Sequence, residues 1–475
     1  MKRTVGTLIM IAALLAIAVP SAFGQLGDCD NSSFSIQNLG TADATVAVTF
    51  YEEDGTAHTP TTLDSVTTNP FTLAAGAMYQ VYVPGIPGLA DGRYSVVVES
   101  TEPIAVIANL IGYTGACGPG NYPAFNGSYS GFDNGDGTYY LPSVVYGFYN
   151  WNSLISIQNT TASDASVTVT IKDPRGNPDK TKNYSIPAFA SAHLDLETEG
   201  AGLGLVSGLN GSAVIEATTG QVVVTDNQTA YGGGKGLTQS YNGFASGAPT
   251  LYVPALYTGF YNWNSSINIQ NVGTAATDVT ITYDDGTVND KNNHACLGNL
   301  SPGESCLVYT PSDKPAGATA FAATITNSAG QDLVAIANAA NGKTKQSQTY
   351  NSFLGGSDTV GLPIIMRGFY NWNTSFRIQN VGTADTTITI TYSNDPDTGA
   401  SGATYTHSET LSPGEAVEVY QPADAHLTDP NWKSGSVTIV SNSGQPIAGI
   451  VNETNAVRQQ AGDGDWSMSY NGKNQ

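Results

Sequence analysis

Apolar and polar positions alternate along much of this chain, in short runs that recur at a regular interval. Ile267 and Ile269 alternate with polar residues, and so do Val279, Ile281 and Tyr283. A period of two places apolar side chains on one face of a strand, and the β-branched residues favour strands over helices. The pattern predicts half-buried antiparallel sheets. The same alternation occurs at Phe34, Ile36, Val46, Val48 and Phe50, at Ile155, Ile157, Val167, Val169 and Ile171, and at Phe376, Ile378, Ile388, Ile390 and Tyr392.

Turn-forming pairs separate these runs. Asp54-Gly55 and Asp285-Gly286 predict hairpin turns, while Pro302-Gly303 and Pro413-Gly414 fit turns in which proline precedes a glycine with positive φ. A later apolar run comes near the end of each unit, at 104–110, 222–225, 333–337 and 447–451. About seven short strands in about 110 residues indicate an immunoglobulin-like sandwich. No amphipathic helix is expected beyond the N-terminal segment.

Three motifs show that the unit is repeated. Gly-Phe-Tyr-Asn-Trp-Asn occurs at 147–152, 259–264 and 368–373, and Ile-Gln-Asn follows it at 157–159, 269–271 and 378–380. Ile-Gln-Asn also stands at 36–38, in a first unit without the tryptophan motif. Tyr-Asn-Gly or Tyr-Asn-Ser comes late in three units, at 241–243, 350–352 and 470–472, and the first unit has Tyr129-Ser130-Gly131 instead.

A spacing of about 110 residues is too long for a solenoid repeat and fits one autonomous domain per repeat. We therefore predict an all-β chain in which four tandem immunoglobulin-like antiparallel sandwiches follow one another as a string. The predicted domains are residues 25–138, 139–248, 249–358 and 359–475.

The segment Ile-Gln-Asn-x-Gly-Thr-Ala, leading into a threonine- and valine-rich strand and then Leu-x-Pro-Gly, resembles the CARDB-type repeats of bacterial surface and secreted proteins. The resemblance covers residues 25–475. It implies sandwich modules associated with adhesion and with holding other modules away from the cell, and it supplies no catalytic residues. This chain departs from that pattern because it has no enzyme module and no evident wall-sorting signal.

The N-terminus has the pattern of an export signal. Lys2 and Arg3 precede an apolar run at 8–19, and Ala22-Phe23-Gly24 places small residues before Gln25. The run is shorter than the roughly 20 residues that span a bilayer, so a signal peptide at 1–24 is favoured over a membrane anchor. No later apolar stretch is long enough to span. We expect a secreted, extracellular protein, with retention at the cell surface as an alternative.

Composition narrows the class further. The chain has 475 residues, of which only 12% are charged, and a formal net charge of −22. Few charged residues and no Gly-X-Y period exclude a coiled coil and collagen, and the 25 tyrosines, 14 phenylalanines and 5 tryptophans argue against disorder. A net negative charge with scattered lysines disfavours nucleic-acid binding.

The four cysteines are even in number, which favours disulfides in an exported chain. Three pairings are formally open, and four free thiols are the alternative. Unit boundaries favour Cys29–Cys117 in the first domain and Cys296–Cys306 in the third. No Cys-x-x-Cys spacing favours a metal site.

Catalytic motifs are missing. The five histidines share no position among the repeats. The chain has no Gly-x-Ser-x-Gly turn between a strand and a helix, no His-Glu-x-x-His and no phosphate-binding Gly-Lys-Ser/Thr loop. We predict a protein that is not an enzyme and has no cofactor. Asp133 and Asp136, and separately Asp395 and Asp397, offer oxygen ligands for Ca²⁺, although the first pair lacks the spacing and distal glutamate of a calcium loop. Solvated acidic turns are the alternative.

The recurring aromatic motif has two interpretations. Exposed rings flanked by asparagine amides suit sugar rings and their hydroxyls. A repeated tryptophan more often packs against its own domain edge or the preceding domain, and we favour that structural role. The candidate sugar-binding residues are Tyr149, Trp151, Tyr261, Trp263, Tyr370 and Trp372.

These observations favour a non-enzymatic extracellular modular protein, a structural or adhesive component of the cell surface or matrix. The alternative function is carbohydrate binding through the Gly-Phe-Tyr-Asn-Trp-Asn loops. The expected partners are other surface proteins, copies of the chain itself or extracellular glycans. Nucleic acid and a membrane span are not expected. An exported hydrolase lacks a supporting set of residues.

Overall fold

The computed structural model describes residues 11–15, 29–113, 123–232, 235–394, 405–455, 457 and 465–474. Regular structure in this part of the chain is nearly all antiparallel β, which confirms the predicted fold class. The α-helices there are single turns, α1 (Leu196–Glu199) and α2 (Thr310–Asp313). None of the described helices combines the length and apolar character needed to cross a membrane.

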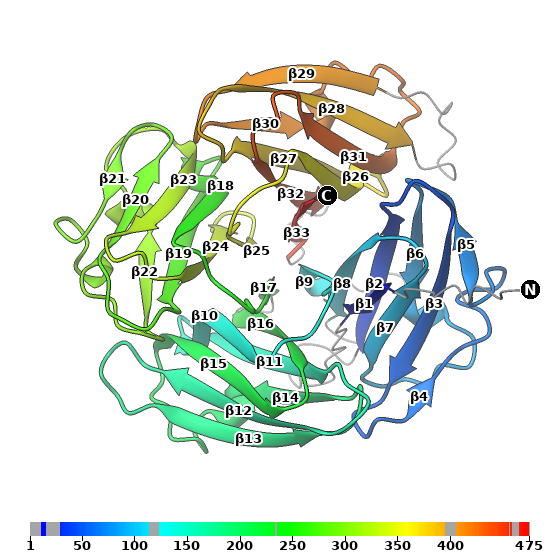
Figure 1. Cartoon of the computed structure of the whole chain (residues 1–475), viewed down its shortest axis with the longest axis horizontal. Coiled ribbons are helices and arrows are strands. Elements are labelled where there is room, and N and C mark those ends of the chain that lie inside the picture. The colour runs from blue at the N-terminus through cyan, green and yellow to red at the C-terminus, as the bar shows by residue number, and fades with distance from the viewer. Residues whose placement is uncertain are drawn as a thin grey trace, which may run out of the picture.

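The second, third and fourth repeats each build two packed sheets from the same succession of strands (Figure 1). In the second repeat, one sheet has the order β13-β12-β15-β10 and the other has the order β14-β11-β16-β17. The first strand, β10, turns through a tight hairpin into β11 and so joins the two sheets. The strands are β10 (Thr138–Phe148), β11 (Trp151–Asn159), β12 (Ala165–Lys172), β13 (Lys180–Ile186), β14 (Ser191–Asp195), β15 (Leu209–Thr219), β16 (Val222–Gly232) and β17 (Lys235–Asn242).

The third and fourth repeats follow the same plan, and β34 adds to β26 at the end of the chain. Their strands are β18 (Thr250–Phe260), β19 (Trp263–Asn271), β20 (Val279–Tyr283), β21 (Val288–Asn289), β22 (Ser305–Tyr309), β23 (Ala320–Asn327), β24 (Leu333–Asn341) and β25 (Gln346–Asn351), then β26 (Thr359–Phe369), β27 (Trp372–Asn380), β28 (Thr386–Asn394), β29 (Tyr405–Leu411), β30 (Ala416–Tyr420), β31 (Ser434–Ser441), β32 (Ile447–Asn455), β33 (Ser467–Asn471) and β34 (Lys473–Asn474).

The first repeat takes its first strand from the predicted signal peptide. Its sheets are β1-β7-β3-β4, with β5 on β3, and β6-β2-β8-β9. Strand β1 pairs with β7, the place that β10 takes beside β15. The signal peptide stays a prediction, and cleavage before Gln25 would leave this edge of β7 unpaired. The strands are β1 (Ile11–Leu15), β2 (Cys29–Asn38), β3 (Ala44–Tyr51), β4 (Ala57–His58), β5 (Phe71–Leu73), β6 (Met78–Tyr82), β7 (Ser95–Ser100), β8 (Ile104–Tyr113) and β9 (Pro123–Ser130).

The alternating runs form strands with one buried face, as predicted. In β20, Val279, Ile281 and Tyr283 lie in the core of the third repeat, while the threonines between them are more exposed. The predicted turns are present as well. Gly286 has a φ of 81° in the Asp-Gly hairpin and Gly303 a φ of 80° after Pro302, conformations that glycine adopts without a Cβ clash.

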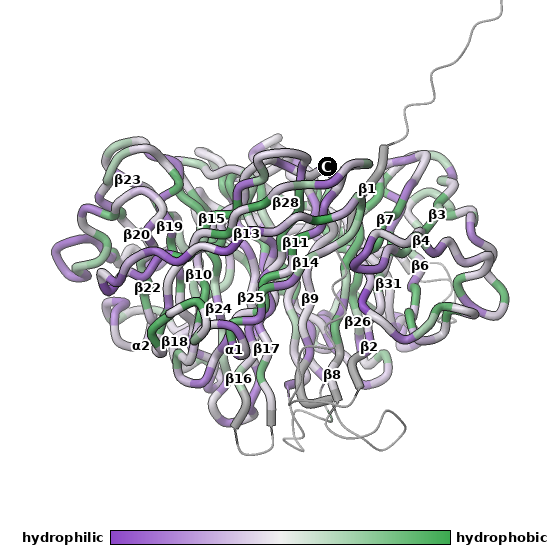
Figure 2. The backbone as a smooth tube through the Cα atoms, turned by 90° about the horizontal axis from the view of Figure 1, so that it is seen from below, coloured by the Kyte–Doolittle hydropathy of each residue, from purple (hydrophilic) through white to green (hydrophobic). Residues whose placement is uncertain are grey.

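The four repeats close into a ring instead of extending as a string (Figure 1). One edge strand of every repeat, β9, β17, β25 or β33, lies at the centre, and each contacts the next around the ring. Figure 2 shows the ring edge-on, with all four repeats in one layer.

Small polar side chains join the central strands. The Asn351 amide donates to the Asn242 carbonyl (2.6 Å), and the Asn242 N–H donates to the Asn351 side-chain oxygen (3.2 Å). Asn471 forms the same pair with Asn351, and Asn242 forms it with Ser130. In each case a repeat reaches back to the one before it.

Asp465 also joins the repeats at the centre of the ring, through a second set of hydrogen bonds. Its fully buried carboxylate accepts hydrogen bonds from the Thr238 N–H (2.9 Å) and from the Ser347 N–H (3.1 Å) and hydroxyl (2.6 Å). Its backbone carbonyl accepts from the Asn126 amide. Burial raises the pKa of Asp465 to about 7, although these hydrogen bonds oppose the rise.

The late apolar runs provide the contacts between neighbouring sandwiches. Val334 and Ile336 of β24 are fully buried in the core cluster of the second repeat, whereas Ala335 and Ala337 face their own repeat. Ile107 of β8 similarly packs into the fourth repeat, which closes the ring. A strand buried on both faces is apolar at consecutive positions, which explains why these runs do not alternate.

Candidate functional site

Three copies of one tight turn carry the aromatic motif. Tyr261 and Asn262, between the paired residues Phe260 and Trp263, have φ of 47° and 68°. Positive φ at both central positions defines a type I′ turn, which favours asparagine and glycine over tyrosine. The tyrosine conformation costs on the order of 1–2 kcal/mol. The equivalent φ values are 49° and 68° at Tyr149 and Asn150, and 47° and 70° at Tyr370 and Asn371.

The strained tyrosines are also the most exposed tyrosines among the described residues. Exposed fractions are 84% for Tyr149, 79% for Tyr261 and 79% for Tyr370. The Tyr261 ring stands edge-on to Phe260, with centroids 4.7 Å apart. An exposed aromatic ring contributes little to a core. Backbone strain that holds such a ring in solvent therefore suggests a role in ligand binding.

Asparagines hold each turn in place. The Asn264 side chain accepts a hydrogen bond from the Gly259 N–H (2.8 Å), and the Asn341 amide donates to the Tyr261 carbonyl (3.1 Å). Asn152 and Asn373 make the bond equivalent to that of Asn264. The second asparagine of the motif therefore has a structural role.

The three tryptophans begin the strands that follow the turns. Trp151, Trp263 and Trp372 are half-buried. Trp263 packs against the core of its own repeat, and Trp372 lies 5.9 Å from Trp466, centroid to centroid. Each ring thus has a packed part and a part that is accessible.

A cavity lies beside the turn of the third repeat, where this repeat meets the fourth. Its volume is about 600 Å³, within the range of small-molecule sites. Aromatic side chains from both repeats line it, together with polar groups that offer donors and acceptors. The lining residues are Tyr257, Phe260, Tyr261, Trp263 and Gln348 from the third repeat and Ser375, Glu418, Tyr420, Asn452 and Thr454 from the fourth.

The polar groups of the cavity are held in defined positions. Tyr257 and Phe260 stack with centroids 5.6 Å apart, and the Asn452 amide donates to the Tyr257 hydroxyl (3.2 Å). Burial raises the pKa of Tyr257, so its hydroxyl stays protonated and able to donate. Glu418 lies 3.5 Å from the buried guanidinium of Arg377. Glu418 is the sole carboxylate among the lining residues that the structure describes.

The strand register places a tyrosine equivalent to Tyr420 in two other repeats. Tyr420 stands opposite Ser375 in β30, and Tyr309 and Tyr82 occupy the same register positions in β22 and β6. All three are exposed, between 44% and 52%.

The acidic residues predicted for Ca²⁺ have other partners. Asp133 forms an ion pair with Lys473, and Asp136 accepts hydrogen bonds from the N–H groups of Gly137 (2.6 Å) and Thr138 (3.3 Å). Calcium binding there stays a prediction. Asp395 and Asp397 lie outside the described residues.

A cluster of metal-type side chains that sequence reasoning missed lies in the fourth repeat. Nitrogen and oxygen atoms of His407, Asp424 and His426 lie within 4.8 Å of one another. The two imidazoles stack in parallel, with centroids 4.1 Å apart and planes 10° apart. Parallel stacked rings do not direct their in-plane lone pairs to one point, so this arrangement does not form a coordination site.

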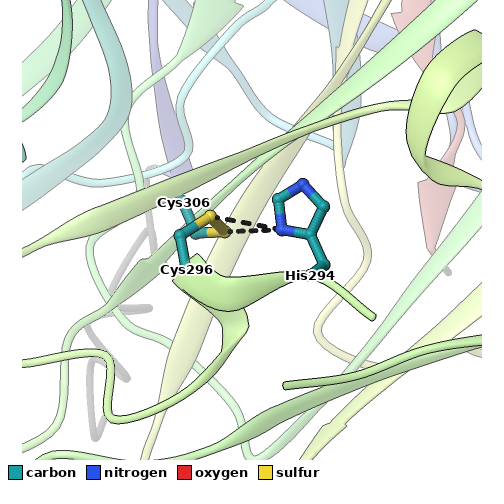
Figure 3. A group of neighbouring side chains, drawn as sticks. All are labelled: His294, Cys296 and Cys306. Atoms are coloured by element: carbon teal, nitrogen blue, oxygen red, sulfur yellow. Dashed lines mark hydrogen bonds between the residues drawn. A yellow bond between two sulfur atoms is a disulfide. The ribbon is translucent and has the colours of Figure 1, made fainter. Parts of the chain in front are cut away.

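The Cys296–Cys306 disulfide is present, which confirms that pairing (Figure 3). Its Cα atoms are 5.5 Å apart, and it ties the short turn at Ala295–Leu297 to strand β22. Cys29 begins β2, whereas Cys117 lies outside the described residues, so the Cys29–Cys117 pairing stays a prediction.

No family model matches this chain, and no curated protein matches it. Solved structures that are similar to parts of it include the following two. The crystal structure of Thermotoga maritima 1070 shares 19% identity and covers 23% of this chain and 95% of its own, with a TM-score of 0.20. The Anabaena sensory rhodopsin transducer shares 18% identity and covers 19% and 94%, with a TM-score of 0.17. The repeated β-domains are confirmed by the structure, while the specific resemblance to CARDB-type modules stays a prediction.

Proposed function

We propose that this chain is a non-enzymatic, extracellular carbohydrate-binding protein, whose ring of sandwiches presents aromatic sites at the junctions between repeats. The observation that carries the proposal is the cavity between the third and fourth repeats. There the exposed, strained Tyr261 faces a lining of further rings and fixed amides. Sugars present apolar C–H faces and rims of hydroxyls, and this combination of aromatic and amide groups suits both.

The lining favours binding over hydrolysis. Glycosidases generally use two carboxyl groups, about 5–9.5 Å apart, one on each side of the scissile bond. Of the described lining residues, Glu418 alone carries a carboxylate, and Arg377 lies beside it. A single paired carboxylate suits a hydrogen bond to a sugar hydroxyl. Adhesion to surface or matrix glycans would be the biological role of such a protein.

Tyr261→Asn separates recognition from folding. Asparagine accepts positive φ, so this variant should be as stable as the wild type or more stable by up to about 1 kcal/mol. It should lose about fivefold or more in affinity for the glycans that the wild type binds, because stacking on an aromatic ring contributes about 1 kcal/mol or more per ring. A glycan array followed by calorimetry on the full chain measures both.

Tyr261→Phe is the matched control, because it keeps the ring and removes only the hydroxyl. It should retain most of the affinity. The triple change of Tyr149, Tyr261 and Tyr370 to asparagine should abolish binding if all three junctions take part. A full chain that retains no glycan on the array, or a Tyr261→Asn variant that binds as well as the wild type, would contradict the proposal.

A further inference from the structure

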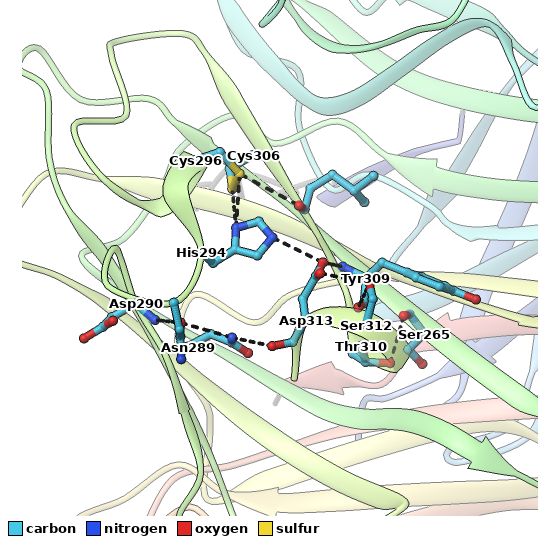
Figure 4. Close-up of polar contacts among 12 residues, drawn as sticks. Ser265, Asn289, Asp290, His294, Cys296, Cys306, Tyr309, Thr310, Ser312 and Asp313 are labelled. Carbon is cyan, nitrogen blue, oxygen red and sulfur yellow. Dashed lines mark hydrogen bonds and ion pairs between the residues drawn. A yellow bond between two sulfur atoms is a disulfide. The ribbon is translucent and has the colours of Figure 1, made fainter. Parts of the chain in front are cut away.

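His294 stands between a carboxylate and a disulfide (Figures 3 and 4). Its Nε2 lies 3.2 Å from Oδ2 of Asp313, and its Nδ1 lies 3.5 Å from the sulfur of Cys296 and 3.9 Å from that of Cys306. An ionised carboxylate only accepts hydrogen bonds, so the contact with Asp313 requires a hydrogen on Nε2. In the neutral imidazole this leaves Nδ1 as a bare acceptor that faces both sulfurs.

The fold holds Asp313 in place for this contact. The same carboxylate accepts hydrogen bonds from the Tyr309 N–H (2.7 Å) and the Ser312 hydroxyl (2.8 Å). Figure 4 shows that Asn289 donates to the Asp313 carbonyl (2.7 Å), which fixes the end of α2. Burial opposes ionisation, but these donors and His294 hold the pKa of Asp313 below its usual range. The imidazole orientation is therefore set before any reaction.

In the disulfide form, the Nδ1 of His294 has no hydrogen-bond donor among the described residues. Disulfide sulfurs carry no hydrogen that could be donated to this nitrogen. Reduction would create a thiol that donates to Nδ1, or a thiolate paired with imidazolium. The dithiol form thus gains an interaction that the disulfide form lacks, which favours reduction relative to a disulfide without this neighbour.

The two sulfurs differ in access. Cys296 is exposed on a short turn, whereas Cys306 is 2% exposed within β22. An external thiolate therefore reaches Cys296 first. The leaving sulfur is then that of Cys306, which also faces His294. When Nδ1 has taken the proton that the external thiol loses, the resulting imidazolium lies next to the departing thiolate and lowers the energy of that step.

We propose that Cys296–Cys306 is a redox-active disulfide that exchanges with an external dithiol, with His294 stabilising the released thiolate and Asp313 positioning His294. One thiolate of the dithiol attacks the sulfur of Cys296, the S–S bond breaks, and its electron pair leaves on Cys306. The second thiolate of the dithiol then displaces Cys296 and becomes a disulfide. Two electrons and two protons pass to the protein, with one proton shared between His294 and Cys306 and the other on Cys296. This activity does not depend on glycan binding.

The test measures the thiol–disulfide equilibrium of the full chain with reduced and oxidised dithiothreitol, and follows the Cys296 and Cys306 peptides by alkylation and mass spectrometry. His294→Gln should lower the equilibrium constant for reduction about tenfold, which corresponds to about 30 mV. In the reduced wild type, alkylation should stay fast down to about pH 6, and in the variant it should slow about tenfold there because the thiolate loses its partner.

Asp313→Asn provides a second variant. It keeps the shape of the positioning residue but removes its charge, so it should shift the pH profile of alkylation part of the way toward that of His294→Gln. His426→Gln is the matched control, because its imidazole also contacts an aspartate, Asp424 at 3.0 Å, but lies in the fourth repeat, whereas this disulfide lies in the third. Equal equilibrium constants and equal pH profiles in the wild type, His294→Gln and Asp313→Asn would show a purely structural disulfide and overturn the proposal.

Discussion

Ser130→Asn should strengthen the junction at which the ring closes. Each of the three later repeats reaches back to the repeat before it with two hydrogen bonds from an asparagine, at Asn242, Asn351 and Asn471. The first repeat has Ser130 at this position, and no equivalent pair with Asn471 is formed among the described residues. A cavity of about 150 Å³ lies between Ser130 and Asn471, which leaves room for the longer side chain.

The magnitude follows from the number of bonds gained. Two hydrogen bonds contribute about 0.5–1.5 kcal/mol each, and ordering the new side chain offsets up to about 1 kcal/mol of this. We expect a net stabilisation of about 1–2 kcal/mol. Asn351→Ala removes the matching pair from an intact junction and calibrates the estimate, with an expected loss of about 2 kcal/mol.

Native-state hydrogen exchange is the most direct assay, because the Asn471 N–H would gain an acceptor. A stabilisation of 1.4 kcal/mol slows exchange about tenfold if opening of the junction limits it. Urea unfolding of the full chain provides a second measurement. The shift of the unfolding midpoint is compared, because a chain of several domains need not unfold in a two-state transition. The reasoning is refuted if Ser130→Asn leaves exchange in β33 unchanged while Asn351→Ala destabilises as expected.

Three further predictions address burial and processing. Burial raises the pKa of Glu453 to about 8, so folding favours its protonated form. The free energy of unfolding should therefore fall as the pH rises from about 4.5 to about 8. Urea unfolding at several pH values measures this dependence, and Glu453→Gln should flatten it. Ile336 faces away from its own sandwich but lies in the core of the second repeat. Ile336→Ala should therefore destabilise the chain by about 2–4 kcal/mol, as for any core residue, and Ile336→Val by about 1 kcal/mol. Mass spectrometry of exported protein should find Gln25 as the first residue, and retention of residues 1–24 would contradict the predicted signal peptide.

Local chemistry explains what could be predicted for the fold. The alternation at Val279, Ile281 and Tyr283 depends on the period of a strand alone, and the turn at Gly286 depends on one positive φ. The Cys296–Cys306 bridge links positions ten residues apart within one repeat. Each of these features is decided by interactions within a short segment, so the sequence carries a direct signal for it.

The sequence also contains a weaker indication that the repeats pack against one another. Residues 333–337 are apolar at consecutive positions, which indicates a strand covered on both faces, whereas a free sandwich needs only one covered face. Polar residues next to each late tyrosine also contact neighbouring repeats at the centre of the ring. Ser347, before Tyr350, is buried there, and Asn351, after it, is partly buried, whereas a separate domain would leave both in water.

The sequence by itself determined the all-β class, the number of repeats and the residues of the aromatic turns, because strand periodicity and turn propensity act between near neighbours. Tertiary structure alone decided that the repeats close on themselves and that Tyr261 is exposed beside Glu418 and Tyr420 of the next repeat. It also decided that His294 directs a bare nitrogen at a disulfide. These contacts depend on how whole sandwiches pack, and packing between distant segments has no period along the chain.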